Sequence, residues 1–296
     1  MSVLKHIITQ TEDGCTVRDI LTARFHISTT LRKQLRRREG AILLNDAPVT
    51  VAQRVRCGDV LRVDVSDEVG CADAISPVDY PLSVLWEDEH LLAIDKSAAI
   101  AVHPAALTEE SVTVAGAVAH YLGSPAFHAV NRLDRGTTGV MLIAKNGYMH
   151  ARCMDLLHTA ALQREYRAVC DGIPSPAAGS ITLPIGRDAD SLLRRCIDPS
   201  GQPAQTEYEV LQICGERALL RLLPHTGRTH QLRVHMAAIG CPLTGDWLYG
   251  TEDRELIARP ALHSHILRFT HPLTGEAVTV TAPIPEDMLR LLEETL

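Results

Sequence analysis

The sequence is poor in aromatic residues and lacks the patterns of several large protein classes. Aromatic side chains make up only 4% of the 296 residues, so a folded core must rest on Leu, Ile, Val and Ala. No stretch approaches the roughly 20 apolar residues of a membrane-spanning helix, and the segment up to Cys15 lacks the apolar run of a signal peptide. None of the eight cysteines forms a CxxC pair. Widely spaced cysteines in a long chain argue against a disulfide framework, and we expect a reduced, cytoplasmic environment.

The composition is that of a globular protein, and its charge is unevenly distributed. Hydrophobic residues make up 46% and charged residues 22% of the chain, and the net charge is −7. Between residues 13 and 66, 10 Lys or Arg stand against 6 Asp or Glu, which gives +4 and leaves −11 for the rest of the chain. A basic segment followed by an acidic body predicts that the segment binds an anionic partner.

Residues 13–66 are predicted to form a small α/β unit, which we call the N-terminal module. Apolar residues at helical spacing indicate a helix over 17–25, and Ser28 is the predicted N-cap of a second helix over 31–38. The remaining predicted elements are strands over 41–44, 47–51 and 60–65, separated by turns.

The polar segment 67–82, with two prolines, is the predicted linker to a second domain over 83–296. Short apolar runs alternate there with turn signals, without the strict strand–helix rhythm of a parallel sheet. The predicted elements are a hairpin over 84–94, helices over 111–121, 150–162, 229–239 and 285–292, and strands over 218–223 and 278–281. We therefore predict an α+β fold.

The segment 130–145 places one carboxylate between two cations. Asp134 stands between Arg132 and Arg135, and the polar loop 136–139 separates it from an apolar strand. Neighbouring cations favour the ionised form of a carboxylate. An ionised aspartate is either a nucleophile or a partner in a structural ion pair, and these residues alone leave both interpretations open.

A second segment, 224–236, concentrates hydrogen-bond donors at the predicted start of a helix. Its donors include Arg228, His230, Gln231 and Arg233. Such a helix start suits a phosphate or another anion. A capped helix on an ordinary surface would explain the same residues.

Taken together, the two segments resemble the RluA branch of the pseudouridine synthases. The family motif His-Arg-Leu-Asp-x-x-Thr-Ser-Gly matches residues 131–139, with Asn131 in place of His and Thr138 in place of Ser. The family motif Thr-Gly-Arg-x-His-Gln-Ile/Leu-Arg matches residues 226–233. The resemblance covers about residues 83–296 and implies a catalytic domain with a mixed, mainly antiparallel β-sheet.

The resemblance also implies roles for individual residues. It makes Asp134 the catalytic nucleophile, Arg233 its ion-pair partner, and Tyr166 the residue that stacks near the target base. The residues expected to position the substrate are Arg132, Arg228, His230 and Gln231. The family breaks the N-glycosidic bond of a uridine in RNA, rotates the base and rejoins it through carbon, so we expect neither a cofactor nor a metal. The sequence leaves open whether Asp134 attacks the sugar, attacks the base or removes a sugar proton.

The N-terminal module resembles the alpha-L RNA-binding motif of a small-subunit ribosomal protein. The second predicted helix and the turn after it carry this resemblance. The cations expected to contact RNA phosphates are Arg32, Lys33, Arg36, Arg37 and Arg38. A solvated helix face would explain the same residues without RNA. We expect an RNA partner, with large-subunit ribosomal RNA as the first candidate, and a monomeric protein.

One alternative is a metal-dependent hydrolase, because His225, His230 and His235 are evenly spaced. A step of five residues turns about 500° around an ideal helix, so these histidines do not share one face. No HExxH motif is present.

A second alternative is a ribosome-assembly factor that binds RNA without catalysis. The presence of Asp134, Tyr166 and Arg233 argues against it, because such a factor does not need all three.

Overall fold

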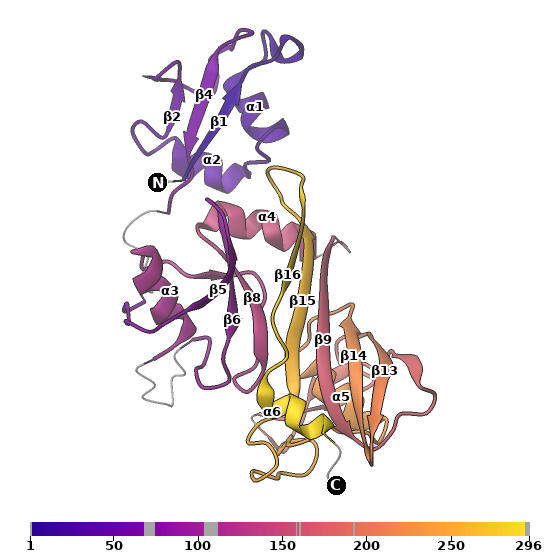
Figure 1. The fold of residues 1–296 in the computed structure, drawn as a ribbon. Helices are drawn as coiled ribbons and strands as arrows, with labels where there is room; N and C mark the ends of the chain where they lie inside the picture. Colours follow the sequence, from indigo (N-terminus) through magenta and orange to yellow (C-terminus); the bar gives the residue numbers. More distant parts are fainter. Residues whose placement is uncertain are drawn as a thin grey trace.

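The computed structural model describes residues 2–67, 75–103, 112–157, 159, 161–191 and 193–293. Figure 1 shows a small N-terminal unit at one end of the molecule and a larger body built around one long sheet.

Two short helices and a four-stranded sheet form the N-terminal module. The elements are β1 (Val3–Ile7), η1 (Gln10–Glu12), α1 (Val17–Ala23), α2 (Thr29–Leu35), β2 (Ile42–Leu44), β3 (Ala47–Pro48) and β4 (Val60–Asp64), with the strands in the order β1-β4-β2-β3. Ser28 caps α2 as predicted, because its hydroxyl accepts a hydrogen bond from the Leu31 amide at 3.2 Å. Strand β1 precedes residue 13 and pairs with β4, so the module begins earlier than the sequence indicated.

The body is an α+β unit with a mixed, mainly antiparallel sheet, as predicted. Its strands are β5 (Ser83–Glu87), β6 (Leu91–Lys96), β7 (His128–Ala129), β8 (Thr138–Ala144), β9 (Leu162–Asp171), β10 (Ala178–Ile181), β11 (Ile185–Arg187), β12 (Arg195–Ile197), β13 (Thr206–Cys214), β14 (Arg217–Pro224), β15 (Leu262–Thr270) and β16 (Ala277–Thr281). Its helices are α3 (Val114–Leu122), α4 (Gly147–Leu157), α5 (Gln231–Ala238), α6 (Glu286–Leu289) and η2 (Arg290–Leu292). The main sheet runs β10-β13-β14-β9-β15-β8-β6-β5, with β16 beside β15 and β7 beside β8.

The two halves of this sheet meet at its one parallel pair among the described strands, β8 and β15. Gly139 of β8 lies opposite Ser264 of β15. Its φ is +104°, and a Cβ atom there would lie 2.2 Å from the Ser264 carbonyl oxygen. Only glycine tolerates both the conformation and the close approach. The loop that carries Asp134 runs directly into β8 at this junction.

Several predicted elements have the wrong bounds. The helix expected over 31–38 is α2, Thr29–Leu35, and the strand expected over 47–51 is β3, which ends at Pro48. The helix expected over 150–162 is α4, which starts at Gly147 and ends at Leu157, and Leu162 is instead a buried residue of β9. The early start follows from Asn146, whose side-chain oxygen accepts a hydrogen bond from the Met149 amide at 2.8 Å. The hairpin expected over 84–94 is confirmed as β5 and β6. Ser111, the expected start of α3, lies outside the described residues.

The N-terminal module is fixed to helix α4 of the body. Tyr148 is buried in the hydrophobic core of the module, and its hydroxyl donates to the Phe25 carbonyl at 2.7 Å. Asp67, the first residue of the predicted linker, accepts a hydrogen bond from the Gly147 amide at 2.9 Å and lies 2.9 Å from His128 Nε2. Burial alone would raise the pKa of Asp67, but these hydrogen bonds lower it. The module therefore docks through both packing and hydrogen bonds. Figure 1 shows α2 of the module facing α4 of the body at this junction.

Candidate active site

Asp134 lies in the loop between β7 and β8, where buried and exposed residues alternate. Asn131 and Leu133 are buried, whereas Arg132 is exposed and 35% of the Asp134 side chain is exposed. Leu133 belongs to the main core of the body. The alternation anchors the loop from below and leaves the Asp134 carboxylate partly open to solvent.

The buried side chain of Lys96 holds this loop from inside the body. Lys96 is 1% exposed, and its ammonium group donates to the carbonyl oxygens of Ser97 at 2.9 Å, Arg135 at 2.8 Å and Thr137 at 3.1 Å. Burial, reinforced by the charge of the nearby Arg259 guanidinium, lowers the pKa of Lys96 to about 8. Two of these charge-assisted hydrogen bonds, to Arg135 and Thr137, thus fix the backbone next to Asp134.

A second buried cation, Arg259, holds the remaining carbonyl of the loop. Its Nη1 atom donates to the Gly136 carbonyl at 3.2 Å. Its Nε and Nη2 atoms bind the two carboxylate oxygens of Asp287 in α6 at 2.7 and 2.8 Å. The C-terminal helix is therefore linked to the Asp134 loop through one guanidinium group.

The two departures from the family motif both have structural partners. The Asn131 side chain donates to the Val140 carbonyl at 3.2 Å and accepts from the Leu142 amide at 2.7 Å. Its amide group therefore makes the two kinds of hydrogen bond with β8 that the backbone of a neighbouring strand would make. The Thr138 hydroxyl lies 2.8 Å from Nδ1 of His263 on β15. Burial lowers the pKa of His263 to about 4, so its ring is neutral at pH 7. Both residues stabilise the loop and the strand junction.

Arg233 approaches Asp134, but its hydrogen bonds go to another carboxylate. Its Nη1 atom lies 3.8 Å from Asp134 Oδ2, which is within ion-pair distance but too long for a hydrogen bond. Its Nε and Nη2 atoms each bind the fully buried Asp246 at 2.7 Å. Burial opposes the charge of Arg233, yet the hydrogen bonds to Asp246 outweigh it and raise the pKa of Arg233. Asp246 thus holds a permanent cation beside Asp134.

His230 and Tyr249 complete this side of the site. His230 Nε2 lies 4.0 Å from Asp134 Oδ2, and its Nδ1 atom lies 2.8 Å from the Tyr249 hydroxyl. The Arg233 guanidinium lies over the Tyr249 ring at 5.0 Å from the centroid. Burial lowers the pKa of His230 more than the Asp134 charge raises it, so His230 is neutral at pH 7.

Tyr166 lies on β9 in the main core, with a side chain that is almost entirely buried. Burial raises its pKa, and the negative charge of Asp134 adds to this effect, which places the ring within electrostatic reach of the carboxylate. The phenol is therefore neutral at pH 7. Only 7% of the residue is exposed, so little of Tyr166 is open to a base.

The other residues expected to position the substrate differ in their surroundings. Arg132 and Arg228 are exposed, and Arg228 Nε donates to the Pro203 carbonyl at 3.0 Å. Gln231 is buried, and its amide oxygen accepts from the Thr226 hydroxyl at 2.7 Å and the Arg228 amide at 3.0 Å. Its amide nitrogen donates to the Gln205 carbonyl at 2.9 Å. Gln231 is thus engaged within the protein, where it fixes the loop before α5.

The five cations predicted to bind RNA do not share one environment. Helix α2 ends at Leu35, so Arg36, Arg37 and Arg38 lie in the turn after it. Arg36 and Arg37 are exposed, as is Lys33, and Arg32 donates to the Thr22 hydroxyl at 2.9 Å. Arg38 instead donates to the Ser66 carbonyl at 2.8 Å and to the Asp64 carbonyl. These internal bonds make Arg38 a structural residue of the module.

Sequence reasoning missed four residues that shape the site, namely Lys96, Asp246, Tyr249 and Arg259. Asp246 and Tyr249 lie outside the two motifs that carry the family resemblance, and no charge pattern singled them out. Lys96 also lies outside both motifs. Arg259 has no sequence signal beyond its place three residues before β15.

The histidines weighed as metal ligands have separate partners. His225 pairs with Glu207 at 2.9 Å, and both ring nitrogens of His235 are engaged, with Thr206 and with the Leu183 carbonyl, each at 2.9 Å. Over the described ranges, no cluster of three or more His, Cys, Asp or Glu side chains is arranged to hold a metal ion. Over the same ranges, no helix is long and apolar enough to cross a lipid bilayer.

Comparisons with known proteins agree on one family. The family model for RNA pseudouridylate synthase matches residues 90–238. The chain is 36% identical over 270 residues to the uncharacterized RNA pseudouridine synthase YjbO of Bacillus subtilis, covering 90% of this chain and 95% of that protein. It is 36% identical over 249 residues to ribosomal large subunit pseudouridine synthase D of Escherichia coli strain K12, covering 78% of this chain and 76% of that protein.

A solved structure supports the same assignment. Human RNA pseudouridylate synthase domain containing 1 has the same fold over 73% of this chain and 86% of that chain, with a TM-score of 0.58 and 26% identity. The region matched by the family model, residues 90–238, includes the Asp134 loop, Tyr166 and the helix that carries Arg233. The chain belongs to the RluA family of RNA pseudouridine synthases.

Proposed function

We propose that this enzyme converts uridine to pseudouridine in large-subunit ribosomal RNA, with Asp134 as its nucleophile. The RNA class is supported by the Escherichia coli relative, whose name specifies the large ribosomal subunit. The proposal places the protein in the cytoplasm as a monomer, because one chain carries both the catalytic body and a module for holding RNA.

The reaction requires one carboxylate and a closed pocket that retains the detached base. The bond between N1 of uracil and C1′ of ribose breaks, a bond between C5 and C1′ forms, and the hydrogen of C5 is replaced by one gained at N1. Asp134 is the partly exposed carboxylate of the site, and the Arg233 cation lies 3.8 Å away. This cation positions the carboxylate that acts on the nucleotide.

The surrounding residues take complementary roles in this proposal. Tyr166 stacks on the flipped base with the exposed part of its ring. Arg233 positions Asp134, and Asp246 in turn fixes Arg233. The exposed cations Arg132 and Arg228 hold phosphates of the flipped nucleotide. His230 and Gln231 support the substrate indirectly, since the first closes the site beside Asp134 and the second fixes the loop before α5.

The N-terminal module is proposed to hold the RNA outside the catalytic pocket. Arg32, Lys33, Arg36 and Arg37 form a basic stretch along and after α2. Contacts of such residues with phosphates give affinity that depends on salt and little on sequence. Arg38 is left out of this set because its guanidinium is bonded inside the module.

The observation that carries the proposal is the Asp134 carboxylate held between a rigid loop and the Arg233 cation. The test maps pseudouridines in total RNA from cells that lack the gene and are rescued with variants. Asp134→Asn should fold and bind RNA yet restore no site, whereas wild type and Asp155→Asn should restore the same sites. Asp155 is the matched control because its side chain is 71% exposed on α4.

Each part of the proposal has its own contrary outcome. If Asp134→Asn restored the pseudouridine sites, Asp134 would be excluded as the nucleophile. Restoration by the wild type only in transfer RNA would contradict the ribosomal assignment and leave the catalytic one intact.

A further inference from the structure

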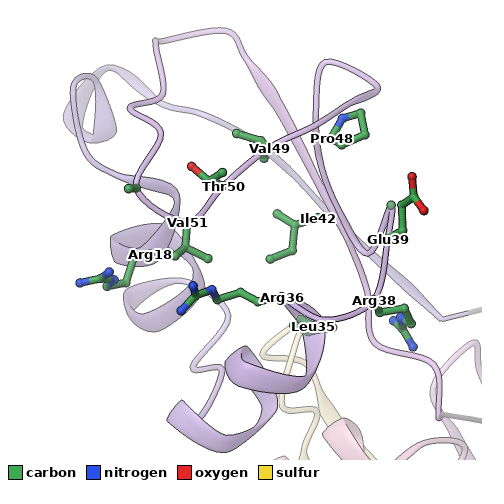
Figure 2. A pocket seen from close by; sticks show the side chains of 12 residues that line it. Arg18, Leu35, Arg36, Arg38, Glu39, Ile42, Pro48, Val49, Thr50 and Val51 are labelled. Carbon is green, nitrogen blue, oxygen red and sulfur yellow. The ribbon is translucent and has the colours of Figure 1, made fainter.

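Two adjoining hollows lie on the surface of the N-terminal module, between α1, α2 and the segment after β3. The large hollow has a volume of about 410 Å³, and its floor consists of Leu35, Ile42, Val49 and Val51 (Figure 2). This volume falls within the roughly 300–1,000 Å³ of small-molecule sites. The floor is apolar, so the large hollow favours a flat, poorly hydrated group.

The small hollow is strongly cationic. Its volume is about 100 Å³, and it is lined by Arg18, Thr29, Arg32, Lys33, Arg36 and Val51. This space is too small for a base with its ribose but suits a compact anion such as one phosphate. Among the described residues, neither the Arg36 guanidinium nor the Lys33 ammonium group has an ion pair or a side-chain hydrogen bond, so both are available to an anion.

The two hollows share Arg18, Arg36 and Val51, so the cations stand between the apolar floor and the anion site. Figure 2 shows the Arg18 and Arg36 guanidinium groups together on one side of the large hollow, with Glu39 and Arg38 on the opposite side. A guanidinium plane stacks on a base and also binds phosphate. An apolar space beside a cationic one, with arginines at the boundary, has the chemistry of a nucleotide.

We propose that these hollows bind one unpaired nucleotide of RNA, with its base in the large hollow and its phosphate in the small hollow. This inference rests on the proposed RNA-binding role of the N-terminal module and makes that role specific. A duplex offers phosphates but no free base face, whereas a bulge or single strand offers both. The module therefore selects RNA with an unpaired nucleotide, at a site separate from the catalytic pocket.

Binding of three labelled RNAs to the full-length enzyme tests the proposal. The probes are a ten-nucleotide oligoadenylate, the same backbone with abasic positions, and a ten-base-pair duplex, and adenine is used because the catalytic pocket acts on uridine. The wild type should bind oligoadenylate about tenfold more tightly than the abasic strand, which corresponds to one stacked base. Equal affinity for the two strands, or tighter binding of the duplex, would overturn the proposal.

Two pairs of variants assign the effect to the hollows. Ala52→Trp fills the large hollow from its exposed rim and should abolish the preference for a base, whereas Ala47→Trp, exposed on β3 outside both hollows, should keep it. Arg18→Gln should weaken binding of both strands and reduce the salt slope by roughly 0.7, the loss of one phosphate contact. Arg24→Gln makes the same charge change on an exposed residue outside the hollows and should have little effect. Identical behaviour within either pair would contradict the assignment.

Two further measurements separate the possible failures. Adenosine monophosphate carries the one base and one phosphate that the hollows take, so it should compete with oligoadenylate, but more weakly than the unlabelled strand, because it lacks the further phosphates that Arg37 would contact outside the hollows. Competition as strong as that of the unlabelled strand would assign the hollows to a free nucleotide and overturn the proposal. Pseudouridine formation on ribosomal RNA is measured in parallel. An active enzyme without a base preference would refute this inference alone, whereas an inactive wild type would contradict the proposed function whatever the oligonucleotides do.

Discussion

Titration of Lys96 should change stability and activity in opposite directions. Its pKa is about 8 in the folded protein and 10.5 in the unfolded chain. Below pH 8 the ammonium is charged in both states, and its burial cost is fully present. Between pH 8 and 10.5 the folded state releases the proton while the unfolded state keeps it. The unfolded state then binds more protons, so stability rises with pH.

The magnitude follows from the difference between the two pKa values. A difference between 10.5 and about 8 corresponds to about 3 kcal/mol. The free energy of unfolding of the wild type, relative to Lys96→Met, should therefore rise by about 3 kcal/mol across this range. Other groups titrate in both proteins, so the difference isolates Lys96. Urea unfolding at several pH values between 8 and 10.5 measures it.

Activity should fall over the same range. A neutral amine has two N–H donors for the three carbonyls that the ammonium now serves, so one hydrogen bond is lost, and two of the three acceptors belong to the Asp134 loop. One net hydrogen bond is worth about 1 kcal/mol, which predicts a loss in kcat of roughly fivefold to tenfold. Lys96→Met should be slower than the wild type and lack this alkaline decline. A flat stability difference, or the same decline in Lys96→Met, would refute the reasoning.

Three substitutions test other parts of the site. Asp246→Asn leaves the buried Arg233 charge poorly compensated, so urea unfolding should show a loss of about 3 kcal/mol, and kcat should fall more than KM rises. Asn131→Ala removes the side-chain acceptor of the Leu142 amide, whereas the Val140 carbonyl keeps its hydrogen bond from the Ser264 hydroxyl at 3.1 Å, so the substitution should cost roughly 1–3 kcal/mol. A large loss of kcat in the folded fraction would show a catalytic role instead. Gly139→Ala forces a Cβ atom to 2.2 Å from a carbonyl and should prevent stable folding. Gly123→Ala has open space around it, so it should lower stability, measured as Tm, only by the roughly 1–2 kcal/mol that a side chain costs at its φ of +61°.

The sequence predicted the elements whose signals are local. The Ser28 cap, the turn at Asn45 and Asp46, and the alternating strand β4 all appear where expected, and both turn residues have the positive φ that such short turns need. The predicted end of α4 was wrong because helical periodicity does not mark where a helix stops, and Leu162 fits the inward face of a strand equally well. Strand β1 was missed because it has only five residues and only one of them is buried.

The same distinction holds at the site: contacts between side chains of sequence motifs were predicted, and contacts with the backbone were not. The proximity of Arg233 to Asp134 was expected from two motifs, and the structure brings them to 3.8 Å. The contacts of Lys96 with Arg135 and of Arg259 with Gly136 join residues 39 and 123 positions apart. Because main-chain carbonyls accept these bonds, they impose no side-chain pattern on the loop, and no pairing could be read from the sequence.

These two cations explain how a loop can hold a partly exposed carboxylate in one orientation. The carbonyls of Arg135, Gly136 and Thr137 all point inward, and buried carbonyls need hydrogen-bond partners. Strand pairing does not supply them before β8 begins, so Lys96 and Arg259 bind all three. With its backbone oxygens directed into the body, the loop presents Asp134 on the opposite side. The orientation of Asp134 is therefore coupled to the charge of Lys96 and, through Arg259, to the C-terminal helix α6.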